Sequence, residues 1–272
     1  MADAGGVPIS PWRRLWLYVV GTLIVLFLVL PTIIVVPMSF GSSRFLRFPP
    51  QEWSVRWYLA YFASLEWRDA TWVSLKAAVA TMLVATPLGV MAAYGLHASQ
   101  LRIARAIETA LVAPLILPVI LVSIAIFFLY ARLGLNNTIT GLVLAHCCLA
   151  LPFVFVTVLA GLKGYDMNQE RVARSLGASR LTAFLTVTLP QIRFSVFSGA
   201  LLAFITSLDE TVVALFISGG EAATLTRRMF NALRDEIDPT VAAISSLLIA
   251  VTLTLLALGL VFGDRRNRHP QA

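Results

Sequence analysis

Six long runs of the sequence contain no Asp, Glu, Lys or Arg, and they restrict the chain to a membrane protein built from helices. The runs cover residues 15–43, 77–101, 109–131, 133–162, 194–208 and 239–263. About 20 helical residues cross the hydrocarbon core of a bilayer, which is about 30 Å thick. The composition agrees, because 58% of the residues are hydrophobic and only 13% are charged. We therefore expect an all-α membrane protein with six transmembrane helices, in a single transmembrane domain over residues 1–272.

The fifth run is too short to cross a bilayer unless two acidic residues lie within the span. It ends at Leu208, and after Asp209 and Glu210 the apolar character resumes up to Ser218. We therefore predict that this helix continues through both acids. Four prolines inside the spans are expected to kink them, which membrane helices tolerate. These are Pro87, Pro114, Pro118 and Pro152, and the predicted spans are residues 15–38, 75–96, 110–131, 139–162, 195–218 and 241–262.

The basic residues are distributed between the two membrane surfaces rather than gathered in a nucleic-acid site. The net charge is +7, which in a soluble chain would suggest nucleic acid, but this chain is too apolar for that interpretation. With six spans, 12 of the 21 Lys and Arg residues lie on the side of the termini. The positive-inside rule then places both termini in the cytoplasm. We expect a multi-pass protein of the bacterial inner membrane, with lipid as a partner and no nucleic acid.

The longest polar segment between spans covers residues 163–193 and is predicted to fold on the cytoplasmic side. Asp166 and Gln169 have the spacing of a helix capping box, and a short helix with one apolar edge follows. Gly177 ends this helix, and Pro190 is expected to end a second short helix before the next span. The apolar edge, which includes Val172 and Leu176, could seat in a groove of a partner or rest on lipid headgroups.

This segment resembles a known loop. Residues 169–190, QERVARSLGASRLTAFLTVTLP, are similar to the EAA loop of permease subunits of binding-protein-dependent ABC importers. That pattern is E-A-A, three residues, Gly, nine residues and Ile-x-Leu-Pro. Arg171 stands where the Glu belongs, with Glu170 one residue early, and Val172 replaces the first Ala. The positions that match or vary conservatively are Ala173, Gly177, Val187, Leu189 and Pro190.

The resemblance extends over nearly the whole chain. Residues 54–62, 207–219 and 224–249 are similar to the second permease subunit of spermidine/putrescine-type importers. The likeness implies an importer-permease architecture whose short loop helix couples to a cytoplasmic ATPase. It also implies three kinds of partner: a second homologous permease subunit, two ATPase subunits and a periplasmic or extracellular solute-binding protein. The residues assigned to ATPase coupling are Glu170, Val172, Ala173, Leu176, Gly177, Ala178, Leu189 and Pro190.

Nucleotide chemistry is expected in a partner and not in this chain. The sequence has no G-x-x-x-x-G-K-[ST] phosphate loop, so ATP and Mg would be bound by separate subunits. Cys147 and Cys148 are adjacent, a spacing that suits neither a disulfide framework nor a metal site. We expect no cofactor in this chain, no metal site and no enzymatic activity.

Four residues are candidates for the path of a cationic solute. Acids within a membrane avoid lipid, so Asp209 and Glu210 should face the path, a basic residue of another helix, or the outer surface. Tyr130 and Phe127 could hold an ammonium group through cation–π attraction, although aromatic residues at a span end commonly form an interfacial belt. His146 could relay protons, but a single polar residue in a span is more commonly satisfied by a backbone carbonyl, which is what we expect here.

The sequence thus predicts a permease subunit of an ATP-driven importer for a small cationic solute such as spermidine or putrescine. Residues 41–68 and 220–238 are the outer segments where the solute-binding protein would dock. One alternative is a stand-alone secondary transporter or channel that needs no ATPase. Another is an intramembrane enzyme, but His97, His146 and His269 are scattered and no nucleophile with a base stands out.

Overall fold

The computed structural model describes residues 15–99, 102–235 and 237–264, with side chains up to residue 257. These residues form helices joined by loops, so the predicted all-α fold is confirmed. The chain divides into two compact units, of which the first joins Met1–Tyr61 with Ile237–Ala250. The second joins Phe62–Glu236 with Val251–Ala272. All the residues predicted to line the path or to couple to an ATPase lie in the second unit.

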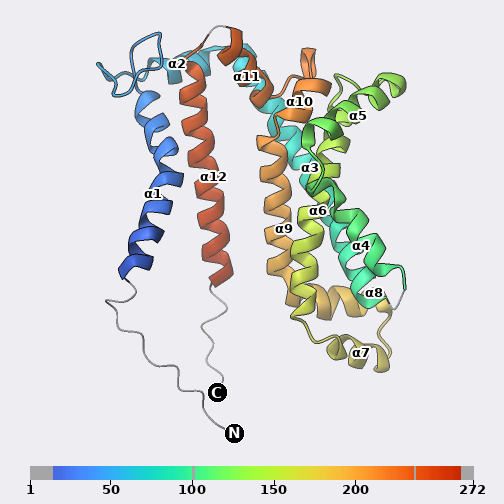
Figure 1. The fold of residues 1–272 in the computed structure, drawn as a ribbon. Helices are drawn as coiled ribbons and strands as arrows, with labels where there is room; N and C mark the ends of the chain where they lie inside the picture. Colours follow the sequence, from blue (N-terminus) through green and yellow to red (C-terminus); the bar gives the residue numbers. More distant parts are fainter. Residues whose placement is uncertain (1–14, 100–101, 236, 265–272) are drawn as a thin grey trace. The chain divides into compact units, whose positions relative to one another are not determined.

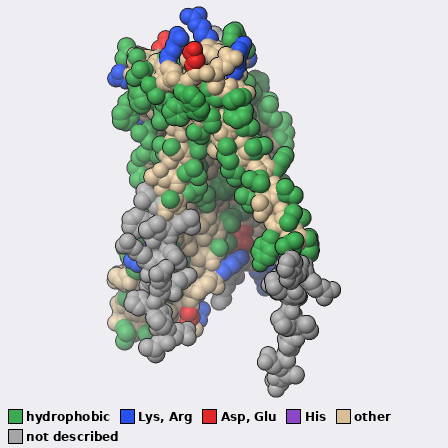
Figure 2. Space-filling view, turned by 90° about the vertical axis from the view of Figure 1, so that its left-hand side faces the viewer, with side chains coloured by type: hydrophobic (Ala, Val, Ile, Leu, Met, Phe, Trp, Pro, Cys, Tyr) green, Lys and Arg blue, Asp and Glu red, His purple; other side chains and the backbone are tan. Residues whose placement is uncertain are grey.

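The first unit contains α1 (Leu15–Met38), most of α2 (Arg56–Ala63) and the start of α12 (Thr240–Asp264). α1 has the bounds predicted for the first span, and none of its side chains is buried. A helix that is apolar all round and exposed is stable only in contact with lipid or another apolar surface. In the space-filling view, hydrophobic side chains are widespread on the visible surface of the described residues (Figure 2).

The core of the second unit consists of three helices that pack on one another: α3 (Leu65–Ala98), α6 (Ile139–Lys163) and α9 (Leu189–Asp209) (Figure 1). α6 has the largest buried share of the candidate spans, 56% of its most apolar window. It contributes Val154, Phe155 and Val158 to a cluster that also holds Ala85 of α3 and Ala203 of α9. The predicted span 139–162 therefore corresponds to the central helix of this unit.

Glycines let the helices of this core approach closely. A Cβ atom on Gly89 of α3 would lie 2.6 Å from Cγ1 of Val154, and one on Gly199 of α9 would lie 3.3 Å from the Cα of the same valine. Small residues at such crossings allow the helix backbones to approach closely. Close packing is important inside a membrane, because the hydrophobic effect contributes little to the association of helices there. Val154 of α6 is thus held between two glycines on the neighbouring spans.

α3 is longer than the predicted span 75–96 because ten further residues at its start are helical. Ser64 caps it by accepting the N–H of Trp67, and the helix then runs for 34 residues, about 50 Å. Its charged residues before the final turn all lie between Glu66 and Lys76. A helix longer than the hydrocarbon core can place such a charged end outside the bilayer. The apolar part, residues 77–98, is long enough to cross a membrane.

The span predicted at 110–131 is wrong as a single helix. α4 (Ala104–Val112) continues into a short 3-10 turn, η2 (Ala113–Leu115), and α5 (Val119–Leu133) then begins at an angle of 95°. Pro114 lies in the turn and Pro118 precedes the first residue of α5. Proline has no N–H and disfavours a helical conformation in the residue before it, so two prolines here end the helix instead of bending it.

The span predicted at 195–218 is also wrong in its continuity. α9 ends at Asp209, and a separate helix, α10 (Val212–Ile217), begins after Glu210 and Thr211. The chain then forms η4 (Gly220–Ala222) and α11 (Leu225–Asp235) before α12. Among the described residues five helices are long and apolar enough to cross a membrane, or six if the bent pair of α4 and α5 counts as one span.

Candidate functional site

The loop between α6 and α9 lies at one end of the second unit, opposite α10 and α11 (Figure 1). It contains α7 (Asn168–Ser175) and α8 (Arg180–Ala183), as the sequence predicts. Gly177 lies between them with φ of +96°, a conformation that residues with a Cβ rarely adopt. The order of helix, glycine bend and helix is therefore confirmed, and Gly177 sets the direction in which the chain leaves α7.

Two details of this loop differ from the prediction. Asp166 accepts the N–H of Asn168 at 2.9 Å, and the cap residue of α7 is Met167, so Asp166 and Gln169 do not start the helix as a capping box. Pro190 does not end the second helix either. α8 runs through a π-helical turn, η3 (Phe184–Thr188), directly into α9.

The π-helical turn explains how a proline is accommodated there. In this turn the N–H of Leu189 donates to the carbonyl of Phe184, five residues earlier. The wider turn shifts the hydrogen-bond pattern just before Pro190, which then occupies the first turn of α9. A missing N–H is tolerated in a first turn. Leu189 and Pro190 therefore lie within the continuous helical run from α8 to α9 and do not mark an exit from a helix.

One face of the loop helices is exposed and apolar. Val172 is 57% exposed and Leu176 is 83% exposed, and Leu181 at the start of α8 is also exposed. Ala173 and Ala178 are half-buried. Large apolar side chains in such a position normally seek a partner surface. The structure thus places four of the predicted coupling residues on or beside one accessible face.

Glu170, which the sequence groups with the ATPase-facing residues, lies on the opposite side of α7. It is 3% exposed, and each of its carboxylate oxygens accepts one hydrogen bond. The hydroxyl of Tyr94 in α3 donates to Oε1 at 2.6 Å, and the hydroxyl of Thr188 in η3 donates to Oε2 at 2.6 Å. Hydrogen bonds to a charged acceptor are short and strong, so Glu170 connects α7 to two other elements.

The surroundings of Tyr94 belong to the same cluster. The rings of Tyr94 and Phe184 lie 4.6 Å apart, and the guanidinium of Arg180 lies 5.5 Å from the centre of the tyrosine ring. Sequence reasoning missed Tyr94 and Thr188, because they are separated from Glu170 by 76 and 18 residues. The sequence does not indicate that a hydroxyl group near the end of a span donates a hydrogen bond to a buried carboxylate.

The opposite end of the second unit carries the two acids of the predicted solute path, and their environments differ. Asp209, the last residue of α9, is exposed. The Glu210 side chain is only 7% exposed, and its carboxylate accepts the N–H of Val213 and of Ala214, each at 3.0 Å. These N–H groups begin α10 and have no partner within the helix. Glu210 therefore caps α10, which is why the helix breaks here instead of continuing.

A buried polar cluster lies beside this break and joins the three core helices. His146 of α6 is 1% exposed, and its Nδ1 shares a hydrogen bond of 2.7 Å with the hydroxyl of Ser207. That hydroxyl also donates to Thr81 of α3 at 3.3 Å. The Nε2 of His146 lies 3.9 Å from Oε2 of Glu210 and has no hydrogen-bond partner among the described residues. The partner of His146 is thus a side chain, and the prediction of a backbone carbonyl is wrong.

The two aromatic candidates lie in different environments. Tyr130 is buried in a cluster with Leu142 of α6 and with Val213 and Ile217 of α10. Phe127 is partly exposed and packs edge-on against Phe128, with ring centres 5.6 Å apart. Tyr130 thus serves the packing of α10 against α5. Phe127 retains an accessible face.

A polar cavity of about 570 Å³ lies near the start of α3, at the same end as α10 and α11. Arg228 of α11 forms an ion pair with Glu66, and its guanidinium lies 5.2 Å from the centre of the Trp67 ring. The sequence places acids and bases together on this side but does not indicate that they surround one space. The charged residues that line the cavity are Glu66, Asp69, Lys76, Glu221 and Arg228.

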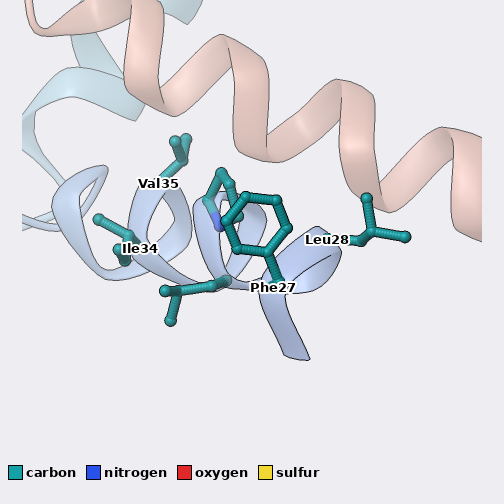
Figure 3. Close-up of a pocket in the computed structure, with 6 residues that line it drawn as sticks. Phe27, Leu28, Ile34 and Val35 are labelled. Atoms are coloured by element: carbon teal, nitrogen blue, oxygen red, sulfur yellow. The ribbon is translucent and has the colours of Figure 1, made fainter. Parts of the chain in front are cut away.

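A second hollow lies along α1 in the first unit. It has a volume of about 530 Å³, and Figure 3 shows apolar side chains around it. Such a lining offers no group that could bind a charged solute. Its surface suits a lipid chain or an apolar helix. The lining residues are Phe27, Leu28, Leu30, Pro31, Ile34 and Val35.

These features define the class of the protein: a membrane helix bundle with a helical loop, of the kind that transporter permeases contain. Residues 85–268 match the model of the binding-protein-dependent transport system inner membrane component. Because this match covers more than half of the chain, the chain belongs to that family. It is a multi-pass permease component of an inner-membrane transport system.

Two characterised relatives share about a third of their residues with this chain. The spermidine/putrescine transport system permease protein PotC of Haemophilus influenzae is 31% identical over 244 residues, covering 89% of this chain and 94% of PotC. The putrescine transport system permease protein PotI of Escherichia coli is 31% identical over 247 residues, covering 88% of this chain and 86% of PotI. The resemblance expected from the sequence is therefore confirmed.

The fold is also found in a solved structure. A bacterial alginate ABC transporter, crystallised in complex with an alginate pentasaccharide-bound periplasmic protein, has a chain that superimposes with a TM-score of 0.71. The match covers 95% of this chain and 97% of that chain, at 15% sequence identity. At this level of identity the likeness concerns the fold alone. It agrees with an importer-permease architecture.

Proposed function

We propose that this chain is the transmembrane subunit of an ATP-driven importer that carries a small cationic solute of the polyamine class. It would act with a second homologous permease, two ATPase subunits and an external solute-binding protein. ATP and Mg would be bound by the ATPase subunits. Both termini of the chain would then lie in the cytoplasm, on the side of α7.

The observation that carries this proposal is the exposed apolar face of α7. Val172 and Leu176 are accessible, and Arg171, Arg174 and Arg180 place positive charge around them. Burying an apolar side chain of this size stabilises a complex by about 1.5–3 kcal/mol. A groove on an ATPase subunit with an acidic rim would use both features. Closure of two ATPase subunits around ATP would then draw the α7 helices of the two permeases together and tilt their spans.

The solute class is supported by the relatives and by the charges at the α11 end. PotC and PotI are named for spermidine and putrescine transport. Asp209 is exposed at the end of α9, and the cavity at the start of α3 contains three carboxylates against two basic groups, of which Arg228 pairs with Glu66. Carboxylates raise the local concentration of cations and favour their entry. A diamine or polyamine fits this end better than an anion does.

The direct test is to identify what binds to the chain and what its partner carries. The tagged chain is purified from bacterial membranes in nanodiscs, and the proteins that accompany it are identified by mass spectrometry. The solute-binding protein recovered in this way is titrated with putrescine, spermidine and a dicarboxylate. Recovery of an ATPase together with micromolar binding of putrescine or spermidine would support the proposal. Tight binding of the dicarboxylate alone would contradict the solute class.

The same preparation distinguishes the importer from a stand-alone transporter. The chain is reconstituted in liposomes without other subunits, and uptake of labelled putrescine is measured with and without an ion gradient. The proposal predicts no uptake under either condition. Uptake by the isolated chain would identify a secondary transporter or channel and overturn the ATP-driven mechanism.

A further inference from the structure

We infer that Tyr94, Glu170 and Thr188 form a latch that transmits movement of α7 to the spans α3 and α9. The inference rests on the proposed function, because it assumes that an ATPase moves α7. In this arrangement Glu170 does not bind the ATPase. It is a positioning residue, and Tyr94 and Thr188 are the groups through which it acts.

α7 has two faces with different tasks. Leu176 is 83% exposed and Glu170 is 3% exposed, although the two residues are separated by less than two helical turns. A partner that seats on the exposed face can push or pull the helix. The buried face must then be attached to the bundle, or α7 would move alone. Among the described residues, the hydrogen bonds that join α7 to the bundle through side chains are the two that Glu170 accepts.

The two bonds end on two different spans. Tyr94 lies one turn before the end of α3, and Thr188 is the residue directly before α9. One carboxylate oxygen serves each span, with donor–acceptor distances of 2.6 Å. Because both bonds meet at one rigid carboxylate, α3 and α9 cannot move relative to α7 without stretching one of them. No Lys or Arg among the described residues forms an ion pair with Glu170, so the two hydroxyl groups are its specific partners.

The latch also encloses the π-helical turn at both of its ends. Tyr94 packs against Phe184, the first residue of η3, while Glu170 binds Thr188, the last. π-helical turns are rare and often mark places where a helix must deform for function. A turn held at one end by α3 and at the other by the helix that an ATPase moves is suited to tilt α9 as a unit.

The test removes one hydroxyl at a time with little change of shape. Tyr94→Phe removes the donor to Oε1, and Thr188→Val removes the donor to Oε2. Thr188→Ser keeps the hydroxyl and is the conservative variant that should restore function. Thr186→Val is the matched control, because Thr186 lies in the same turn but is exposed and donates only to the carbonyl of Thr182.

Two readouts separate transmission from folding. Hydrogen exchange on the purified chain in nanodiscs reports how firmly α7 is attached. Residues 168–176 should exchange about tenfold faster in Tyr94→Phe and Thr188→Val, while α6 is unchanged. The second readout is the amount of labelled putrescine imported per ATP hydrolysed by the assembled transporter. This ratio should fall at least about fivefold in both variants, with the ATPase recovered in normal amounts, and should stay within about twofold in Thr188→Ser and Thr186→Val.

The possible outcomes are distinct. A normal ratio in Tyr94→Phe and Thr188→Val would overturn the latch, as would loss of the ATPase from these variants, because the hydroxyls would then support docking and not transmission. Equal loss in Thr186→Val would also overturn it. If the wild-type chain itself recovers no ATPase, the proposed function fails instead. The exchange measurement on the chain alone then still decides whether the three side chains attach α7.

Discussion

Among the described residues of the second unit, two glutamate side chains with little exposure, Glu170 and Glu210, lie at opposite ends and are satisfied in different ways. Glu170 accepts two hydroxyl groups that lie 76 and 18 residues away in the chain. Glu210 accepts two backbone N–H groups that lie three and four residues ahead. The first carboxylate joins separate elements, whereas the second shapes a single turn. Burial and charge are alike, so only the partners reveal that one residue is a connector and the other a cap.

This difference predicts how far the effect of a substitution spreads. Loss of a long-range acceptor alters how α7, α3 and α9 move together. Loss of a local cap alters the start of α10 and little else, because orphaned N–H groups affect mainly their own turn. The substitutions below compare the α7 end of the second unit with the α10 end, beginning with the change that should affect transport most.

Gly177→Val should abolish uptake and leave membrane insertion intact. At φ of +96° a valine is strained by about 1–2 kcal/mol or more, so the bend would open and Glu170 of α7 would lose its contacts with Tyr94 and Thr188. Gly134→Val is the control, because Gly134 also has a positive φ, +68°, and nothing within 4 Å of an added Cβ, but it lies after α5. Uptake of labelled putrescine and the membrane level of each variant are measured. If both variants lose uptake equally, strain alone is responsible and the α7 bend has no special role.

Glu210→Ala should destabilise α10 locally by about 1–2 kcal/mol, because two N–H groups lose their acceptor. Hydrogen exchange at residues 212–217 should accelerate about tenfold, and residues 168–176 should be unaffected. Glu210→Gln keeps one carbonyl acceptor and should show a smaller change. A change at α7 as large as that at α10 would mean that Glu210 acts over long range, and the contrast with Glu170 would be lost.

Leu176→Asp should reduce ATPase recovery about five- to tenfold without loss of stability. The side chain is 83% exposed, so its replacement should change the free energy of unfolding by less than about 0.5 kcal/mol. A charge in an apolar groove, however, weakens docking strongly. Ser175→Asp adds the same charge on an exposed polar neighbour and is the control. Equal recovery of the ATPase with Leu176→Asp and wild type would show that this face of α7 does not dock.

The sequence predicts features that depend on local residue patterns. Runs of uncharged residues located the membrane spans, and Gly177 located the bend after α7. Two spans were wrong where a local group competed with helix continuity: prolines 114 and 118 end one helix, and Glu210 caps the next. Counting apolar residues cannot predict where these helices end, because the count does not take into account which backbone N–H groups are missing or which have a side-chain acceptor.

The sequence could not assign the partners of the buried groups. Tyr94 and Thr188 meet Glu170 only after α3, α7 and η3 have packed, and Ser207 meets His146 only when α6 and α9 lie side by side. Such pairs depend on the rotation of each helix about its axis. In apolar spans that rotation leaves a weak signal, because lipid-facing and buried positions use similar residues.

Asp209→Asn should have a small effect. Its side chain is exposed, so stability should change by less than about 0.5 kcal/mol. An exposed pair between a carboxylate and an ammonium group is worth about 0.5–1 kcal/mol, which corresponds to a rise of about two- to fivefold in the KM for putrescine uptake. Asp209→Glu keeps the charge and is the control. If both variants raise the KM equally, the charge of Asp209 does not contact the solute.

Measuring the KM for putrescine uptake in Glu210→Gln as well shows which of the two adjacent acids meets the solute. Glu210 is more deeply buried than Asp209, and a rule based on burial alone would give it the larger effect on uptake. Both of its oxygens, however, already accept the N–H groups of α10, so little of its charge is available to a passing cation. The KM should therefore rise more in Asp209→Asn than in Glu210→Gln. The opposite order would assign the solute to Glu210 and would mean that the carboxylate leaves α10 during transport.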